Sequence, residues 1–85
     1  MKKLEDGFKI EEDKHTTITS FGKFKDLDTS NENIWSYYAM AKDFANPDDE
    51  LIYVDTYYGP LMGMGNLYLK DKDGNFTYGA TLWIS

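Results

Sequence analysis

The spacing of apolar and polar residues along the chain predicts several strands and one helix. Residues 51–58 are Leu-Ile-Tyr-Val-Asp-Thr-Tyr-Tyr, a run rich in β-branched and aromatic residues that predicts a strand. Residues 16–24 gather threonine, isoleucine and phenylalanine and predict a second strand. We expect the short stretch 7–11 to pair with that second strand.

Residues 30–45 have the spacing of an amphipathic helix. Thr29 precedes Glu32 by three positions, which is the pattern of a capping box, in which two side chains satisfy free backbone N–H groups at a helix start. Asn46 and Pro47 are expected to end the helix. Apolar residues recur at steps of three and four and predict a stripe that packs on a sheet: Ile34, Tyr37, Tyr38, Ala41, Phe44 and Ala45.

The C-terminal third predicts a β-hairpin. Asp73-Gly74 lies between two alternating runs and favours a two-residue type I′ turn, flanked by Lys72 and Asn75. In that register one face, which we expect to pack on the helix, pairs Leu69 with Tyr78, Leu67 with Ala80 and Gly65 with Leu82. The other face pairs Lys70 with Thr77, Tyr68 with Gly79 and Met64 with Trp83.

The predicted fold is therefore an α+β two-layer sandwich of order β(β)αβββ, with one helix packed on an antiparallel sheet. Eighty-five residues fit a single domain, residues 1–85, because a chain of this length supports one hydrophobic core. The element order resembles the general plan of cystatin-type folds. This resemblance concerns the order alone and implies no function.

Composition narrows the functional classes. The formal charge is −6, the chain has no cysteine, and all nine basic residues are lysine. Without arginine, the residue best suited to phosphate recognition, direct nucleic-acid binding is disfavoured. Residues 26–55 hold eight acids and only Lys42 as a base, a local charge of −7 that can steer a basic partner.

No residue pattern predicts catalysis, a cofactor or a metal site. His15 is the only histidine and is expected on the surface. Residues 71–75 resemble part of a calcium loop, but the first ligand position would fall on Leu69, so a hairpin turn is the better interpretation. No run of 18 apolar residues and no leader pattern is visible, so we expect a cytoplasmic protein without membrane contact.

The aromatic residues predict a binding surface. Strand alternation places Tyr53, Tyr57, Tyr68 and Trp83 together on the sheet face away from the helix, with Asp55 among them. Exposed tyrosine and tryptophan are common hot spots of protein interfaces. Two alternatives remain open: the N-terminal residues cover this face, or a second copy of the chain covers it as a homodimer.

These observations favour a non-enzymatic, acidic protein-binding module that docks on a basic surface of its partner. In size, charge and composition the chain resembles small inhibitors of phages and mobile elements, some of which act as DNA mimics in the channel of a nucleic-acid-processing enzyme. The alternatives are a module that binds a sugar-like ligand on the tyrosine-rich face, an acidic housekeeping protein, and, least favoured, a small enzyme. The predicted partner-binding residues are Asp26, Asp28, Asp43, Asp48, Asp49, Glu50, Tyr53, Asp55, Tyr57, Tyr68 and Trp83.

Overall fold

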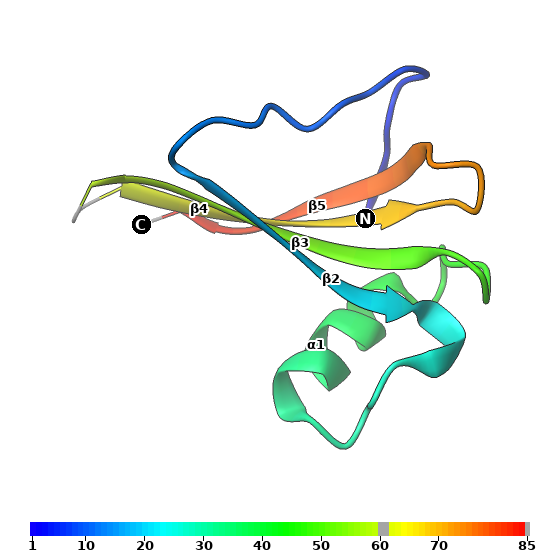
Figure 1. The fold of residues 1–85 in the computed structure, drawn as a ribbon. Helices are drawn as coiled ribbons and strands as arrows, with labels where there is room; N and C mark the ends of the chain where they lie inside the picture. Colours follow the sequence, from blue (N-terminus) through cyan, green and yellow to red (C-terminus); the bar gives the residue numbers. More distant parts are fainter. Residues whose placement is uncertain (60–61, 85) are drawn as a thin grey trace.

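The computed structural model describes the backbone of residues 1–59 and 62–84 and the side chains of residues 1–57 and 63–82. Within these residues one antiparallel sheet of five strands carries a single α-helix, α1 (Glu32–Ala41), which confirms the predicted α+β fold (Figure 1). The order of the strands across the sheet is β1-β5-β4-β3-β2. The strands are β1 (Lys2–Lys3), β2 (Thr16–Lys23), β3 (Glu50–Gly59), β4 (Met62–Lys70) and β5 (Phe76–Ile84).

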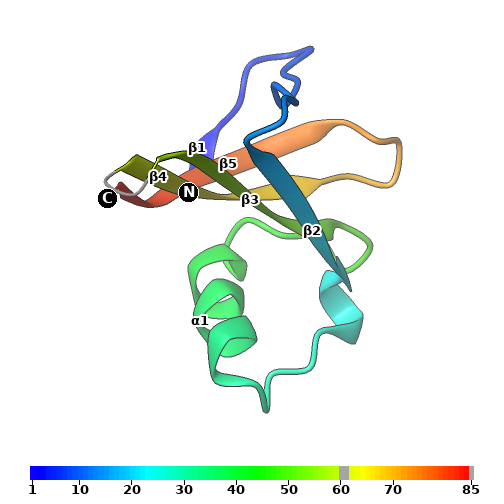
Figure 2. The same cartoon turned by 60° about the vertical axis from the view of Figure 1, so that its left-hand side comes forward.

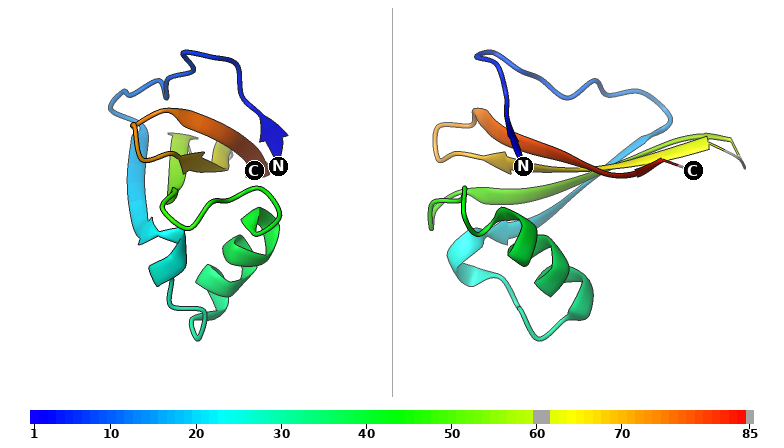
Figure 3. Two further views of the ribbon diagram at one scale, coloured as in Figure 1. Left: turned by 90° about the vertical axis from the view of Figure 1, so that its right-hand side faces the viewer. Right: turned by 180° about the vertical axis from the view of Figure 1, so that it is seen from behind.

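The two faces of the sheet have different covers. Helix α1 lies against one face, and the N-terminal segment, residues 4–15, crosses the other (Figures 1 and 3). Figure 2 shows how strongly the strands twist between these two covers, as antiparallel sheets do. Both faces of the central strands are therefore shielded, although only one of them is shielded by a helix.

The core lies between the sheet and α1. Leu51, Leu67 and Leu69 are fully buried, and they pack with Ala41 of the helix and with Phe24 of a short 3₁₀ turn, η1 (Phe24–Asp26). Burial of one such leucine stabilises the fold by about 2 kcal/mol relative to leaving it in water. The predicted apolar stripe is confirmed for Tyr37, Tyr38, Ala41 and Ala45, which belong to this cluster or pack against it. Phe44, also predicted in the stripe, is 37% exposed and contacts Tyr78.

A second apolar layer lies under the N-terminal segment. Ile52 and Val54 alternate with the helix-facing residues of β3 and are only 5% and 3% exposed. Phe8 of the segment contacts Tyr68 and Phe76, with ring centroids 5.4 and 6.1 Å from its own. The far face of the sheet is therefore covered, in agreement with one of the two alternatives left open by the sequence.

The start of α1 differs from the predicted capping box. The N-cap is Asn31, whose side-chain oxygen accepts hydrogen bonds from the backbone N–H groups of Asn33 and Ile34, at 3.0 and 3.3 Å. Thr29 lies before the helix in a turn and is exposed. The prediction was wrong because asparagine caps a helix at least as well as threonine and stands two positions closer to the first helical turn.

The helix is also shorter than predicted. It ends at Ala41, whose carbonyl accepts the N–H groups of both Phe44 and Ala45 in a closing turn. Residues 42–49 then lead into β3 without further helix. Because α1 has only ten residues, and no helix in the described part of the chain is longer, none has the length and apolarity needed to cross a membrane.

The C-terminal hairpin is present, but its turn is not type I′. Gly74 has a positive φ of 88°, whereas Asp73 does not, and the Gly74 N–H donates to the Asp71 carbonyl at 3.0 Å. This geometry is a type I turn followed by a left-handed glycine, which closes a three-residue loop. The Asp71 side chain stabilises the turn by accepting hydrogen bonds from the N–H groups of Asp73 and Asn75.

The longer loop changes the register beside the turn, and a separate irregularity changes it at the far end of the hairpin. The predicted pairs Leu69–Tyr78, Tyr68–Gly79 and Leu67–Ala80 are confirmed in the middle of the hairpin. Irregularities between Gly65 and Asn66 and between Leu69 and Lys70 shift the rest, so the predictions for the outer pairs were wrong. The observed outer pairs are Lys70 with Phe76, Gly65 with Trp83 and Met64 with Ile84.

The predicted pairing of residues 7–11 with the strand at 16–24 was wrong. Residues 7–11 form no strand, because Gly7 turns the chain with a φ of 81° and the following residues lie across the sheet face. The first strand is instead β1, which pairs with β5 through Lys2–Gly79 and Lys3–Tyr78. A two-residue strand has no detectable period in the sequence, so this long-range pairing could not be predicted.

Candidate partner-binding surface

Two polar residues of β3 form an exposed surface on the helix side of the sheet. Asp55 and Tyr57 point to the same face because they are two positions apart in an extended strand. Both are exposed, and Tyr57 retains 55% of its accessible area. Their partners across β4 are Gly65 and Gly63, which carry no side chains. We call Asp55 and Tyr57 the β3 surface.

Tyr53 borders the β3 surface but is packed against the helix. Its ring stacks on that of Tyr37, with centroids 5.6 Å apart and planes inclined by 17°. Burial raises the pKa of Tyr53 to about 12, and the negative charge of Asp55 and the neighbouring Tyr37 add to this rise. The sequence correctly placed Tyr53, Asp55 and Tyr57 on one face, but that face is the helix side rather than the side away from it.

Tyr68 does not belong to this group. It pairs with Ile52, so it lies on the opposite face, where it packs between Phe8 and Phe76 beneath the N-terminal segment. Burial raises its pKa. The prediction of one face that holds Tyr53, Tyr57 and Tyr68 was wrong, because Tyr68 pairs with Ile52, which faces away from the helix. The side chain of Trp83, the fourth predicted member, lies outside the described residues.

Three of the predicted acidic binding residues stabilise the fold through internal hydrogen bonds. Asp49 is only 4% exposed, and its carboxylate accepts the N–H of Asn46 at 2.8 Å. Glu50 accepts the hydroxyl of Ser20. Asp28 accepts both the N–H and the hydroxyl of Ser30, and these bonds hold its pKa below the usual value.

Asp48 is exposed but paired. Its carboxylate lies 3.0 Å from the ammonium group of Lys25 and 4.0 Å from that of Lys23. The hydrogen bond and charge of Lys25 lower the pKa of Asp48, which in turn raises that of Lys25. Folding therefore brings lysines from outside residues 26–55 onto the acidic stretch and reduces its local charge. Asp26 and Asp43 are exposed, and they remain with Asp55 as acids open to a partner.

The predicted acidic residues and tyrosines do not make one continuous site. Asp48 to Glu50 lie at the start of β3, whereas Tyr57 lies near its end. At about 3.3 Å per residue, Glu50 and Tyr57 are separated by about 23 Å along the strand. The structure brings together Asp55, Tyr57 and the packed Tyr53, and it leaves Asp48, Asp49 and Glu50 at the opposite end of β3.

The helix presents an exposed aromatic residue that the sequence analysis did not select. Trp35 is 50% exposed and stacks on Tyr38, with ring centroids 5.7 Å apart. Tyr38 in turn contacts the buried Phe24 at 4.9 Å. Trp35 directly follows Ile34, a member of the apolar stripe of the helix. A residue beside the stripe is expected to border the core without entering it, so the sequence did contain this information.

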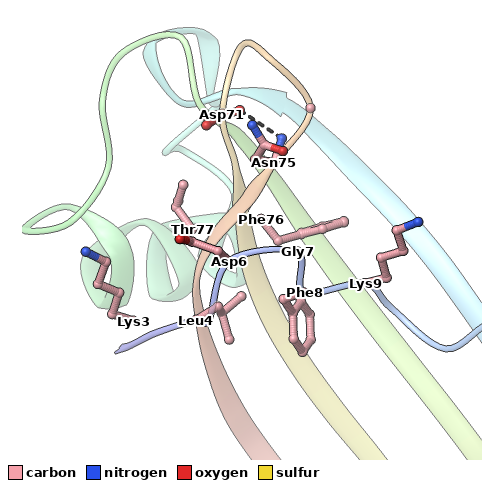
Figure 4. A pocket seen from close by; sticks show the side chains of 11 residues that line it. Lys3, Leu4, Asp6, Gly7, Phe8, Lys9, Asp71, Asn75, Phe76 and Thr77 are labelled. Atoms are coloured by element: carbon pink, nitrogen blue, oxygen red, sulfur yellow. Dashed lines mark hydrogen bonds between the residues drawn. The ribbon is translucent and has the colours of Figure 1, made fainter.

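A hollow of about 420 Å³ lies between the start of the N-terminal segment and the hairpin turn (Figure 4). Lys3, Asp6, Lys9 and Phe8 line it on one side and the hairpin turn on the other. The carboxylate of Asp71, which also lines it, is engaged by the backbone of its own turn (Figure 4). In the part of the chain that the structure describes, no three His, Asp or Glu residues are placed to hold a metal ion.

The single histidine lies in a tight turn before β2. The backbone N–H of His15 donates to the carboxylate of Asp13 at 2.7 Å, and its carbonyl accepts the N–H of Tyr57 at 2.9 Å. These bonds connect the end of the N-terminal segment to the β3 surface.

A comparison with known protein families, with curated proteins and with solved structures found no match to this chain.

Proposed function

We propose that this chain is a non-enzymatic protein-binding module that docks on a basic surface of a partner protein through the β3 surface. The observation that carries the proposal is the presence of an exposed carboxylate, Asp55, and an exposed aromatic ring, Tyr57, on one face of the same strand. Interface hot spots commonly have this character, because a tyrosine contributes a large contact area at low conformational entropy.

The chemistry of the two residues fits a lysine or arginine of the partner. Residues two positions apart in a strand are about 7 Å from each other, so one long basic side chain can contact both. Its charged end would pair with the carboxylate of Asp55, and its stem or guanidinium plane would lie over the Tyr57 ring. The glycines opposite, Gly63 and Gly65, add no side chain of their own to this surface.

The charge of the whole molecule supports the same class of partner. A net charge of −6 attracts basic proteins over a distance and increases the rate of encounter. The partner that we propose is a nucleic-acid-processing enzyme, whose basic channel an acidic domain would occupy and thereby inhibit. Asp26, Asp43 and Asp55 would then act in steering, since they are exposed, whereas Asp49 would act only in folding.

The alternative of a sugar-like ligand stacked on a tyrosine platform has less support. That interpretation depends on several rings that share one exposed face. Tyr68 lies on the opposite face under Phe8, and Tyr53 is packed on Tyr37, so Tyr57 is the ring of these three that is exposed for stacking.

A photo-cross-linking experiment tests where a partner binds. We would place a photoreactive phenylalanine analogue at Tyr57 and, as a control of similar exposure, at Trp35. In a lysate of the cognate host, the analogue at position 57 should capture a basic protein with nucleic-acid-processing activity, and addition of the acidic domain should inhibit that activity. Capture from position 35 alone would place binding elsewhere on the molecule.

Binding kinetics with the captured partner then separate steering from contact. Asp55→Asn should slow association and reduce its salt dependence, because it removes a steering charge. Tyr57→Ala should speed dissociation by about thirtyfold, the equivalent of about 2 kcal/mol for an aromatic hot spot. If both variants bind like the parent chain while their melting temperatures stay unchanged, the β3 surface is not the binding site.

A further inference from the structure

The two edges of the sheet are protected to different degrees. At the β5 edge, β1 pairs with Tyr78 and Gly79 and brings two exposed lysines, Lys2 and Lys3, to the margin. Lysine at a sheet edge opposes the addition of further strands. At the other margin β2 is the last strand, and no described segment lies along its outer side (Figure 3, left).

The hydrogen-bond pattern shows which groups of β2 point outward. The Tyr57 N–H donates to the His15 carbonyl, so Thr17 and Thr19, which follow at steps of two, also direct their backbone groups toward β3. Ile18 and Ser20 therefore direct theirs away from the sheet. Thr16 has the same orientation, but its N–H donates to the Asp13 carbonyl at 3.1 Å.

The outer part of β2 has the composition of a pairing edge. Residues 16–22 contain no charged residue and no proline, and Ile18 is 39% exposed. The strand is regular from Thr16 to Ser20, and a register shift interrupts it before Lys23. The features that block strand addition, lysine and a bulge, thus occur only where the regular part of β2 ends.

We propose that β2 pairs with β2 of a second copy of the chain, in antiparallel orientation, to give a symmetric dimer with one continuous sheet. An antiparallel pair of identical strands is self-complementary about a two-fold axis, so one edge supplies both sides of the interface. With the axis at Thr19, the outward N–H and carbonyl groups of Ile18 in one copy meet those of Ser20 in the other. This pairing forms four hydrogen bonds and brings uncharged side chains together.

The neutrality of the edge is the reason to choose a second copy as the occupant. Each copy carries a charge of −6, so two copies repel each other least where the strand itself carries no charge, and residues 16–22 have no charged side chain. The carboxylates of Asp13 and Glu50 lie beside this edge, where they accept hydrogen bonds from the hydroxyls of Thr16 and Ser20. The basic partner proposed above would instead gain from acidic residues. The dimer is independent of that function, because it uses the edge of β2 and not the β3 surface.

The first test is the oligomeric state of the full chain, measured by sedimentation equilibrium over a range of concentrations. We expect a monomer–dimer equilibrium that shifts toward dimer at higher salt, because salt screens the repulsion between two acidic molecules. A monomer at every concentration and salt level would overturn the proposal. A dimer that dissociates as salt rises would also overturn it, since ion pairs would then hold the interface.

Matched variants locate the interface. Ile18→Lys should weaken the dimer at least about tenfold, because two lysines then meet near the two-fold axis. Ala39→Lys, which adds the same charge at an exposed position of α1, should leave the dimer at least as strong as in the parent chain. If both lysines weaken the dimer equally, the interface does not involve β2.

Two further measurements guard against a variant that simply fails to fold. A chain synthesised with an N-methyl group on Ile18 loses one outward donor but keeps every side chain, and it should be monomeric with an unchanged circular dichroism spectrum. Because the chain has no cysteine, single Ile18→Cys, Thr19→Cys and Ser20→Cys variants report the register by disulfide formation. A dimer that persists with N-methyl-Ile18, or that forms none of the three cross-links, would contradict pairing through β2.

Discussion

The ring of Tyr53 lies almost parallel to that of Tyr37, and this contact joins strand β3 to helix α1. Burial raises the pKa of Tyr53 to about 12, and the charge of Asp55 adds to the rise. The unfolded chain would ionise this tyrosine near its ordinary value of about 10. The contribution of Tyr53 to stability should therefore be complete below pH 10 and be lost as the pH rises to about 12.

We predict that Asp55→Asn lowers the pKa of Tyr53, because it removes a negative charge that opposes ionisation. The ¹³C resonance of the Tyr53 ring, followed as a function of pH, measures this directly. Asp73→Asn, a change of the same charge in the hairpin turn, is the control and should leave the titration in place. Equal titration curves for Asp55→Asn and the parent chain would mean that Asp55 does not act on the Tyr53 ring.

The observed helix cap gives a second prediction. Asn31→Ala should lower the free energy of unfolding by about 1 kcal/mol, because two N–H groups of the first turn lose their acceptor. Thr29→Ala should leave the urea midpoint almost unchanged, since Thr29 lies outside the helix. A larger effect at position 29 than at position 31 would restore the capping box that the sequence predicted.

A third prediction separates two neighbouring acids. Asp49→Ala should reduce stability by about 1–3 kcal/mol, because it removes a buried carboxylate and the part-buried hydrogen bond that this carboxylate accepts from the N–H of Asn46. Asp48→Ala breaks only an exposed ion pair with Lys25 and should change the melting temperature little. Thermal unfolding at pH 7 compares the two. If Asp48→Ala proved the more harmful, the exposed ion pair would outweigh the hydrogen bond of the buried Asp49 carboxylate.

Features of the fold that are determined by residues close together in the sequence could be predicted, and features that depend on distant residues could not. The helix stripe, strand β3 and the middle of the hairpin were predicted because neighbouring residues determine them. The side of the sheet on which Tyr53 lies was not, because both faces of β3 are covered. Leu51 and Tyr53 alternate with Ile52 and Val54, so apolar side chains occur on both faces, and the period does not reveal which face takes the helix.

Only the part of the candidate site that depends on neighbouring residues could be predicted from the sequence. Asp55 and Tyr57 were placed together correctly because strand alternation is local. The exclusion of Asp48 and Asp49 from this site required tertiary information, because their partners Lys25 and Asn46 are set by how the loops pack. Charge counted along the sequence could not show that folding would place Lys23 and Lys25 beside Asp48.

The final prediction concerns the close packing of Tyr68 on Gly79, its partner in β5. A Cβ atom at position 79 would lie 2.8 and 2.9 Å from two ring carbons of Tyr68, closer than real Cβ contacts. Glycine at this position allows the ring to lie against the backbone of the neighbouring strand. Gly79→Ala should therefore lower the free energy of unfolding by about 1–3 kcal/mol, the usual cost of overpacking.

A double-mutant cycle tests the physical cause of this loss. Tyr68→Ala alone should also destabilise the chain, because Phe8 and Phe76 lose their central contact. When the ring is already absent, however, Gly79→Ala should cost much less, since the added methyl group no longer meets it. Urea unfolding of the four chains gives the coupling energy. Additive effects would show that Gly79 stabilises the chain through its backbone conformation and not through the space that it leaves for the Tyr68 ring. The contact between Tyr68 and Gly79 would then contribute little to the packing of the N-terminal segment.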